Sequence, residues 1–256
     1  FGSLIQVPEG LAEKLPALKQ LSEATSQDLF VSEAFKRLGP LVQQAELLAA
    51  QYDAVVANPP YLGRKWMSPL LKKWYQKSWS NCKSDLYAGF LHRCLELLRP
   101  SGHSSLVTMD SWMFAPAYEE FRFETLKLAS IPSLIHLGPR AFPSISGEVV
   151  STQASVFRLL RGGQSRPLFV DCTGVNSSLK KEAHFREGRG RFSNFKQTDF
   201  LSIDGASLAY WLTSTAFRIL VESPSLKKVG KPRSGLTTGD NPRFLRKWFE
   251  VVAVNC

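Results

Sequence analysis

Apolar residues along this chain follow two spacings, and the change from one to the other falls near residue 51. Between Leu11 and Gln51 they recur every three or four positions, which is the period of one face of a helix. The next six residues, Tyr52 to Ala57, form a short apolar run of the kind found in buried parallel strands. The pattern therefore predicts a helical lead-in over residues 1–50 and, directly after it, the first strand of a sheet.

Strand and helix patterns alternate from this strand to about residue 175. Asp85 can cap a helix, and Arg99-Pro100-Ser101-Gly102 can stop it. The run from Val149 to Leu160 alternates apolar and polar residues, and we expect it to form a hairpin with Leu168–Cys172. The elements expected between these points are a helix over residues 86–98, a strand over 104–109, a helix ending near 129 and a strand over 134–137. The order predicts an α/β fold with a mostly parallel sheet and one antiparallel strand.

Two further stretches are marked by basic residues. Gly63–Asn81 interleaves lysines with aromatic residues, which suits a loop that lies against a nucleic-acid backbone. The same residues also suit a surface helix with buried tryptophans, and both interpretations stay open. After Thr173, basic residues crowd among glycines, so we expect the chain to leave its main domain there.

The composition points to a partner and a compartment. The 256 residues carry a net charge of +10 with a pI of about 9.6, which favours a polyanion such as nucleic acid, with simple solubility as the alternative. The four cysteines lie far apart without a C-x-x-C pair, which argues against a zinc site or a disulfide framework and fits a reducing cytoplasm. We see no apolar run of about 18 residues, so we expect no membrane span. The chain begins with Phe1, and we expect it to be a fragment of something longer.

Asn58-Pro59-Pro60-Tyr61 follows the first predicted strand, at the end where ligands bind to open α/β sheets. Proline fixes its own φ, has no N–H, and pushes the residue before it toward extended geometry. Asn58 and Pro59 are therefore held stiffly and offer carbonyl oxygens with few competing donors. Such a group can receive an NH2 group, with Tyr61 ready to stack on the ring that carries it. The alternative is a proline-rich turn after a core strand.

This arrangement resembles motif IV of the amino-methyltransferases that use S-adenosylmethionine. The resemblance implies that the Asn58 side-chain oxygen and the Pro59 backbone oxygen accept hydrogen bonds from the exocyclic amine of adenine and aim its lone pair at the methyl donor. It also implies that the base leaves the duplex, at a cost of a few kcal/mol. Stacking on Tyr61, worth roughly 1–3 kcal/mol, offsets much of that cost. Pro60 is expected to border the cofactor as well.

Further stretches are similar to one branch, the gamma-order adenine-N6 DNA methyltransferases. Asp85–Phe90 looks like motif V, which implies that Phe90 packs on the adenine of the cofactor. Ser104–Met109 looks like motif VI, a strand of the sheet. Ala141-Phe142-Pro143 looks like motif VIII, which implies that Phe142 sandwiches the flipped base against the motif IV tyrosine. For both phenylalanines, ordinary core packing is the alternative.

A narrower likeness is to the methyltransferases of BREX phage-defence systems and to fused type II restriction-methylation enzymes. It rests on Asp110–Phe114, Ser146–Val150 and Gly235–Leu245. It implies that residues 51–175 are the catalytic, target-base half of a Rossmann-like methyltransferase domain, and that residues 176–256 are a basic linker and the start of a target-recognition region. Double-stranded DNA and the proteins of a defence or restriction system are the partners it implies.

The chain departs from this family in one respect. The family binds S-adenosylmethionine with a glycine-rich loop after its first strand, and in gamma order that loop precedes motif IV. Only about fifty residues precede Asn58, and they hold no such loop. We therefore expect the cofactor half, and most of the target-recognition domain, to lie outside this chain, which alone is not expected to turn over.

Three hypotheses follow. The first is methyl transfer from S-adenosylmethionine to N6 of adenine in DNA by a longer enzyme. The second keeps the chemistry but changes the substrate, because the same motif serves methylation of rRNA bases and of glutamine in translation release factors. The third is an inactive DNA-binding remnant. The residues expected to contact nucleic acid are Arg64, Lys65, Lys72 and Lys73, and no metal site is expected.

Overall fold

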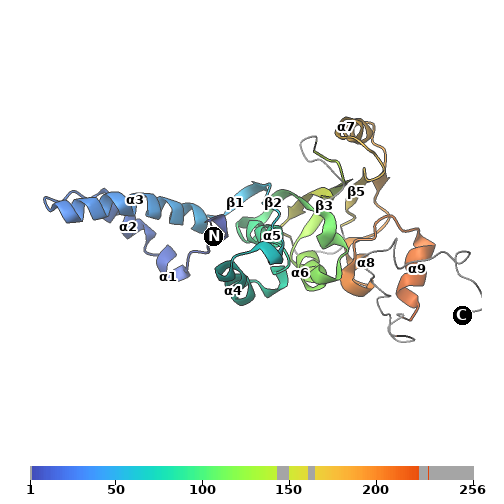
Figure 1. Ribbon diagram of the computed structural model, residues 1–256, viewed down its shortest axis with the longest axis horizontal. Coiled ribbons are helices and arrows are strands. Elements are labelled where there is room, and N and C mark those ends of the chain that lie inside the picture. Colours follow the sequence, from blue (N-terminus) through green and yellow to red (C-terminus); the bar gives the residue numbers. More distant parts are fainter. Residues whose placement is uncertain (1, 143–149, 161–164, 225–229, 231–256) are drawn as a thin grey trace, which may run out of the picture. The chain divides into compact units, whose positions relative to one another are not determined.

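The computed structural model describes residues 2–142, 150–160, 165–224 and 230 (Figure 1). The chain divides into two units, Phe1–Val221 and Glu222–Cys256. Of the second unit, only residues 222–224 and 230 are described. The Gly235–Leu245 stretch therefore lies outside the described residues, as do Pro143 and residues 146–149.

A six-stranded mixed sheet forms the centre of the first unit. Its strand order is β1-β2-β4-β3-β5-β6. The pairs β1–β2 and β3–β5 are parallel, whereas β2–β4, β3–β4 and β5–β6 are antiparallel. The strands are β1 (Tyr52–Ala57), β2 (Leu98–Met109), β3 (Ser130–Gly138), β4 (Thr152–Arg158), β5 (Leu168–Asp171) and β6 (Arg191–Phe192). The carboxyl ends of β1, β2, β3 and β5 thus meet at one edge of the sheet.

The helices come before, between and after these strands. They are α1 (Glu9–Ala12), α2 (Leu15–Glu23), α3 (Leu29–Ala49), α4 (Pro69–Ser78), α5 (Leu86–Glu96), α6 (Glu119–Leu128), α7 (Ser178–Arg186), α8 (Gln197–Phe200) and α9 (Ser214–Glu222). The predicted α/β class is confirmed, but the prediction of a single antiparallel strand is wrong, because β4 and β6 both run antiparallel to the other described strands. The predicted helical lead-in corresponds to α1–α3. Along the part of the chain that the structure describes, no helix is long and apolar enough to cross a membrane.

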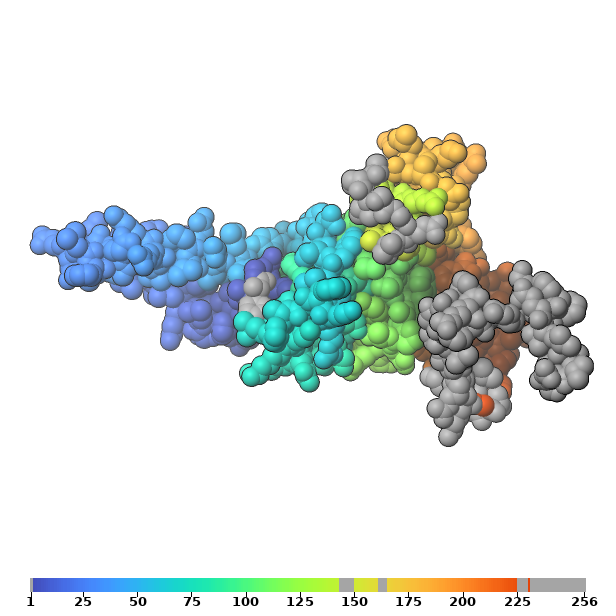
Figure 2. Space-filling view, in the orientation of Figure 1, coloured from blue at the N-terminus to red at the C-terminus, as the bar shows by residue number. Residues whose placement is uncertain are grey.

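One face of the sheet packs against α5 and α6. Leu106, Leu134 and Phe157 point to this face from three strands and are at most 1% exposed. Leu91 of α5 and Phe121 of α6 belong to the same core. In the space-filling view, the residues of α4 and α5 (teal) and of α6 (green) form a continuous layer (Figure 2). The helices that follow β1 and β2 in the chain thus cover this face.

The predicted hairpin partner of the Val149–Leu160 run is wrong. The strand in this run, β4, pairs antiparallel with β2 and β3, and β5 pairs parallel with β3 on its other side. The antiparallel hairpin of the fold is therefore β3–β4. Alternation along a run shows that one face is covered, but it does not say which neighbour the run joins.

The expected stop at Arg99-Pro100-Ser101-Gly102 is also different in the structure. Helix α5 ends at Glu96, and β2 already begins at Leu98. The pairing with β1 is irregular there, because Tyr52 faces Leu98 while Ala54 faces His103. Ser101 takes a positive φ of 67°. The Pro-Ser-Gly segment is thus an irregularity within a strand, so the turn signal was real but the helix had ended before it.

Two expected helical regions take a more detailed form in the structure. The loop expected over Gly63–Asn81 contains the helix α4, because Ser68 caps it by accepting a hydrogen bond from the Leu71 N–H. The alternative of a surface helix with buried tryptophans is thus confirmed for the helix, but only Trp79 is buried, at 5% exposure, whereas Trp66 is 73% exposed. The helix expected to end near residue 129 is present as α6, which ends at Leu128, and the chain reaches it from Asp110 through 3-10 turns over Asp110–Met113 and Pro116–Tyr118. Pro116 explains the break between the two turns, since it lacks the N–H that a continuous helix needs.

Residues after 175 also belong to this first unit. Phe200, Leu208 and Tyr210 are at most 1% exposed and lie in the same core as the sheet. Arg191 and Phe192 add the sixth strand. The segment expected to be a linker thus contributes to the core as far as Tyr210. The division of function at residues 50 and 175 stays a prediction.

Candidate active site at the carboxyl edge of the sheet

The Asn58–Tyr61 segment leaves the carboxyl end of β1, as predicted, and its polar end is open. Asn58 is exposed, Pro59 is buried and Pro60 is exposed. Burial of Pro59 anchors the segment, while the amide of Asn58 stays accessible to solvent. The arrangement satisfies the first requirement for a receptor of an external NH2 group, because the acceptor is not packed inside the core.

Asp85 holds the rest of this loop in place. Its Oδ1 atom accepts hydrogen bonds from the backbone N–H of Leu62 at 3.0 Å and of Tyr87 at 3.2 Å. The Leu86 N–H in turn donates to the Leu62 carbonyl at 3.0 Å. Burial raises the pKa of the Asp85 carboxyl above its ordinary value, although the N–H donors oppose that rise. Asp85 is therefore a helix cap, as expected, and it also ties the start of α5 to the loop after β1.

Tyr61 lies half-buried against the core. Its ring meets the ring of Tyr87 edge-on, with centroids 6.2 Å apart and planes at 84°. Its hydroxyl lies 3.4 Å from the Val107 carbonyl oxygen of β2. Partial burial raises the pKa of the Tyr61 phenol. The ring is thus supported from the protein side, and its role in stacking a base stays a prediction.

Tyr87 extends this support. It is fully buried, stacks on Tyr118 with centroids 5.8 Å apart, and its hydroxyl lies 2.9 Å from Ser111 Oγ. Ser111 follows Asp110 directly after β2. The loops after β1 and β2 are therefore coupled by one aromatic cluster with satisfied hydroxyls.

The two phenylalanines proposed by resemblance lie in different parts of the unit. Phe90 sits on α5, half-buried at the border of the core. Phe142 is half-buried and follows Gly138, where β3 ends. No described contact joins Phe142 to Tyr61. The cofactor role of Phe90 and the base-stacking role of Phe142 stay predictions.

The basic residues proposed to contact nucleic acid lie on the 3-10 turn Arg64–Trp66 and on α4. Arg64, Lys65 and Lys73 are exposed, while Lys72 is half-buried and donates from Nζ to the Lys65 carbonyl at 3.3 Å. The Lys65 ammonium lies 5.3 Å from the ring centroid of Trp66, which is 73% exposed. A charge and an open aromatic face are thus close together just beyond the Asn58–Tyr61 loop.

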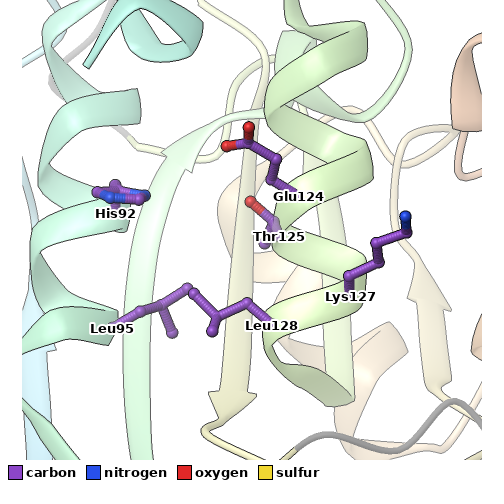
Figure 3. Close-up of a pocket in the computed structure, with 6 residues that line it drawn as sticks. All are labelled: His92, Leu95, Glu124, Thr125, Lys127 and Leu128. Carbon is purple, nitrogen blue, oxygen red and sulfur yellow. The ribbon is translucent and has the colours of Figure 1, made fainter.

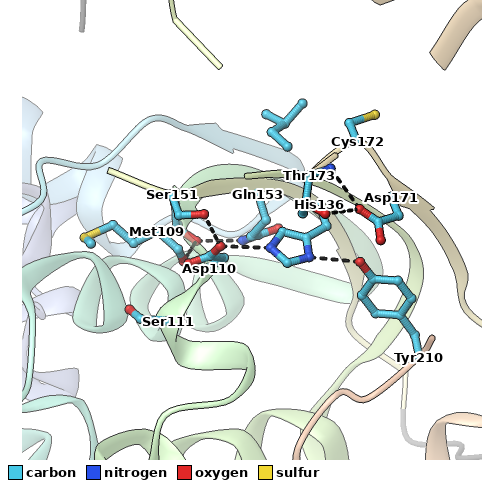
Figure 4. Close-up of polar contacts among 12 residues, drawn as sticks. Met109, Asp110, Ser111, His136, Ser151, Gln153, Asp171, Cys172, Thr173 and Tyr210 are labelled. Carbon is cyan, nitrogen blue, oxygen red and sulfur yellow. Dashed lines mark hydrogen bonds and ion pairs between the residues drawn. The ribbon is translucent and has the colours of Figure 1, made fainter. Parts of the chain in front are cut away.

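A polar network that the sequence did not reveal lies further along the same edge (Figure 4). His136 Nε2 is 2.8 Å from Asp110 Oδ2, and His136 Nδ1 is 2.9 Å from the Tyr210 hydroxyl. Ser151 Oγ donates to the same Asp110 oxygen. Because a carboxylate only accepts, Nε2 carries the proton that faces Asp110. Asp110 could be suspected from its place after a strand, but nothing marked His136 or Tyr210.

The network sets the ionisation of its carboxylate. Burial raises the pKa of Asp110, but the hydrogen bonds from His136 and Ser151 outweigh burial and hold the pKa below its ordinary value. Burial raises the pKa of the Tyr210 phenol, with the nearby Asp171 charge adding to the rise. At neutral pH the network therefore contains a carboxylate and a protonated phenol joined through one imidazole.

A cavity of about 480 Å³ lies between α5 and α6 (Figure 3). Leu95 and Leu128 approach each other across it, and polar side chains complete the lining. The lining residues are His92, Leu95, Glu124, Thr125, Lys127 and Leu128. None of them is a predicted site residue. Within the described ranges, no group of three potential ligands is placed to hold a metal ion, and Cys82, Cys94 and Cys172 are buried free thiols.

A family model, the Eco57I restriction-modification methylase, matches residues 10–142, slightly more than half of the chain. The chain belongs to this family. The match contains the Asn58–Tyr61 loop, its Asp85 support and the Asp110 turn. The predicted family resemblance is therefore confirmed at the level of a restriction-modification methylase.

Curated relatives agree with this membership of the Eco57I methylase family. The chain is 40% identical over 257 residues to the adenine-specific methyltransferase BrxX of Escherichia coli O9:H4 (strain HS), covering 98% of this chain and 21% of that protein. It is 33% identical over 217 residues to the adenine-specific methyltransferase PglX of Lacticaseibacillus casei (strain Zhang), covering 82% of this chain and 18% of that protein. The chain thus spans about a fifth of the length of these relatives.

Solved structures of low identity give weaker likenesses to this Eco57I-family chain. A nuclease-deletion mutant of the Type ISP restriction-modification enzyme LlaGI, in complex with a DNA substrate mimic, is 14% identical with a TM-score of 0.46, covering 77% of this chain and 21% of that one. The DrdV–DNA complex is 16% identical with a TM-score of 0.41, covering 63% and 18%. Scores of this size add nothing to the assignment, which rests on the family match.

Proposed function

We propose that this chain is the target-base half of a longer adenine-N6 DNA methyltransferase of a phage-defence or restriction-modification system. The observation that carries the proposal is the exposed Asn58 at the carboxyl end of β1, beside a buried Pro59 and a supported Tyr61 ring. The names of the relatives BrxX and PglX as adenine-specific methyltransferases support the choice of adenine. We expect the longer protein to act on double-stranded DNA in the cytoplasm, with other proteins of its system.

The chemistry assigned to this chain is reception of the base. The Asn58 side-chain oxygen and the Pro59 carbonyl oxygen accept the two hydrogens of the exocyclic amine. Two acceptors on one amine favour a tetrahedral nitrogen whose lone pair points away from the ring, so positioning and electrostatics supply the rate enhancement. Tyr61 stacks on the base and offsets part of the cost of taking it out of the duplex.

The residues present fit only one side of S-adenosylmethionine. Pro60 is exposed beside Asn58, and Phe90 offers a half-buried ring on α5. The glycine-rich loop that the family uses is not in this sequence, so these residues alone do not form a complete site. When bound to the complete enzyme, the cofactor supplies the methyl group.

Substitution of Asn58 tests the proposal. In the full-length protein, Asn58→Ala is expected to lower methyl transfer from labelled S-adenosylmethionine to duplex DNA by at least about 100-fold, because the amine loses one of its two acceptors. Asn194→Ala, an exposed asparagine elsewhere in the unit, is the matched control and should retain activity. Retained activity of Asn58→Ala, with N6-methyladenine found in the product nucleosides, would rule out the mechanism.

The choice of substrate needs a separate assay. Duplex DNA, rRNA and a release-factor protein are incubated side by side with the full-length wild type and labelled cofactor. Label in DNA alone, recovered as N6-methyladenine, supports the proposal. Label in rRNA or in protein favours the second hypothesis, and DNA binding without any transfer favours an inactive remnant.

A further inference from the structure

A single carboxylate oxygen is bonded to both sides of the connection between β3 and β4. Asp110 Oδ2 accepts from His136 Nε2 at 2.8 Å and from Ser151 Oγ (Figure 4). His136 lies near the end of β3, and Ser151 directly precedes β4. Phe142 belongs to this connection, so its two ends meet at one side chain.

The Ser151 end depends on Asp110 more than on the sheet. Ser151 precedes the first residue of β4, Thr152, whose ladder partners are Met109 and Gly138. The Asp110 N–H donates to the Ser151 carbonyl at 3.1 Å, in addition to the side-chain bond. Asp110 therefore extends the attachment of the connection by one residue beyond the ladder, with two bonds.

The His136 end is held on its other side. His136 Nδ1 meets the hydroxyl of Tyr210, which is 1% exposed and stacks on Phe169 with centroids 4.6 Å apart and planes at 7°. Lys181 Nζ donates to the carbonyls of Leu137 and of Cys172, the latter at 2.7 Å. The imidazole is thus fixed, and a rigid imidazole can fix the carboxylate in turn.

The residues on either side of this carboxylate along the chain contact the loop that carries the proposed base receptor or its support. Asp110 follows β2 directly, and β2 is the parallel neighbour of β1, which leads into Asn58. Tyr61 lies against the Val107 carbonyl, three residues before Asp110, and Ser111 bonds to Tyr87 beneath Tyr61. Asp110 therefore lies on the segment that contacts both the Tyr61 loop and the connection carrying Phe142, whose rings the family resemblance assigns to opposite faces of one base.

We propose that Asp110, acting with His136 and Ser151, is a positioning residue that fixes both ends of the connection carrying Phe142 and so presents this ring to the target base. The proposal rests on the proposed function for the identity of the base. If these three residues had a purely structural role, their substitution would lower the stability of the protein without a specific effect on the position of the target base.

The test compares three variants of the full-length protein, with Asp53→Asn as the matched control. Asp53 is an exposed carboxylate at the opposite end of β1, paired with Arg99 at 3.1 Å. Asp110→Asn removes the charge that holds His136, and Ser151→Ala is a milder variant that keeps the Asp110–His136 pair. The target adenine is first located by mapping methylated positions, and is then replaced by 2-aminopurine, whose fluorescence rises when it leaves the stack.

Asp110→Asn is expected to lower kcat about tenfold or more and to reduce the 2-aminopurine signal, while KM for DNA stays within about twofold. Ser151→Ala should shift both readouts in the same direction by a smaller factor, and Asp53→Asn should match the wild type. An unchanged kcat and fluorescence in Asp110→Asn, with active wild type, would overturn the positioning role and leave the proposed function standing. A fall in kcat that is accompanied by a loss of DNA affinity and a lower unfolding temperature would overturn the positioning role too, since it indicates a structural role.

Amide hydrogen exchange separates the two proposals. Whatever the wild type methylates, Asp110→Asn should accelerate exchange of the amides of residues 140–142, 150 and 151 by about tenfold, with little change around Asp53. Failure of the wild type to methylate adenine, together with this local acceleration, would refute the proposed function but retain the positioning role of Asp110. Unchanged exchange at residues 140–142, 150 and 151 would refute the positioning role in either case.

Discussion

The carboxyl edge of the sheet has an exposed end, at β1, and a buried end, at β2–β5. The two ends differ in how many of their polar side chains are hydrogen-bonded to other residues of the chain. At the β1 end, Asn58 is exposed and Val56 is 81% exposed, and β1 pairs with β2 alone among the described strands. At the β2–β5 end, His136, Asp110 and Tyr210 are bonded to one another and largely buried. Groups at the first end are accessible to solvent or to a ligand, whereas groups at the second end hold the edge together.

Arg122 gives the largest expected effect, at the buried end. Arg122 is 1% exposed, and its guanidinium donates to the carbonyls of Trp112 and Ala115, and twice to Gly205 at 2.9 and 2.6 Å. Arg122→Met removes this donor from the Trp112 and Gly205 carbonyls and leaves Ala115 only its bond from the Tyr118 N–H, so we expect the free energy of unfolding to fall by about 3–5 kcal/mol. Chemical denaturation measures it.

The control for Arg122 is Arg37→Met. Arg37 forms an exposed ion pair with Glu33 at 3.0 Å on α3, and such pairs are worth roughly 0.5 kcal/mol. If the two variants lose similar stability, the buried end is not more tightly held than the surface, and the comparison between the two ends fails.

Gly89 tests the packing of α5 against α4, next to the exposed end. A Cβ atom added at Gly89 would lie 2.6 Å from Cζ of Tyr75, a side chain that is 1% exposed and donates to the Leu86 carbonyl. Gly89→Ala should therefore cost about 1–3 kcal/mol through overpacking, despite the better helix propensity of alanine. Gly10→Ala is the matched control within α1, where the added atom meets nothing within 4 Å and the next residue is Leu11. We expect Gly10→Ala to be neutral or stabilising, and the opposite order would contradict the packing.

The same contrast explains what could be predicted from the sequence. Asn58-Pro59-Pro60-Tyr61 was visible because its residues act through local backbone rules and adjoin a recognisable strand. The network of Asp110, His136 and Tyr210 was not visible, because it joins residues 26 and 74 positions apart that carry no common local pattern. Tertiary pairing, and not local propensity, brings such side chains together.

The sheet order shows the same limit. Strand positions could be predicted from apolar runs. Five of the six described strands, β1 to β5, overlap a run that was expected to form a strand. The insertion of β4 between β2 and β3 could not be predicted, because every run there is compatible with more than one neighbour. The sixth strand, Arg191–Phe192, has only two residues in a basic stretch and therefore left no apolar signal.

Substitutions of Tyr61 separate the stacking of its ring on the base from the contact of its hydroxyl with the Val107 carbonyl. Tyr61→Ala should lower methyl transfer by the stacking free energy of one base, about 1–3 kcal/mol, or roughly 5- to 150-fold. Tyr61→Phe should stay within about threefold, because the hydroxyl is 3.4 Å from its acceptor and makes at best a weak bond. Single-turnover rates on folded protein measure both. Tyr61→Leu, which keeps bulk without an aromatic face, is the control, and a rate equal to that of the wild type would exclude stacking.

Exposed charges beside this end give the smallest expected effect. Replacing Arg64, Lys65 and Lys73 with Gln should make the slope of log affinity against log salt less negative by about 0.9 for each phosphate that the protein no longer neutralises, on any DNA sequence. The matched control replaces Lys14, Lys36 and Arg37 on the N-terminal helical segment, which changes the net charge equally. Titrations of duplex DNA at several salt concentrations measure the slopes. Equal changes in both sets would mean that net charge alone attracts DNA, and that the turn and helix beside Asn58 hold no special place in binding it.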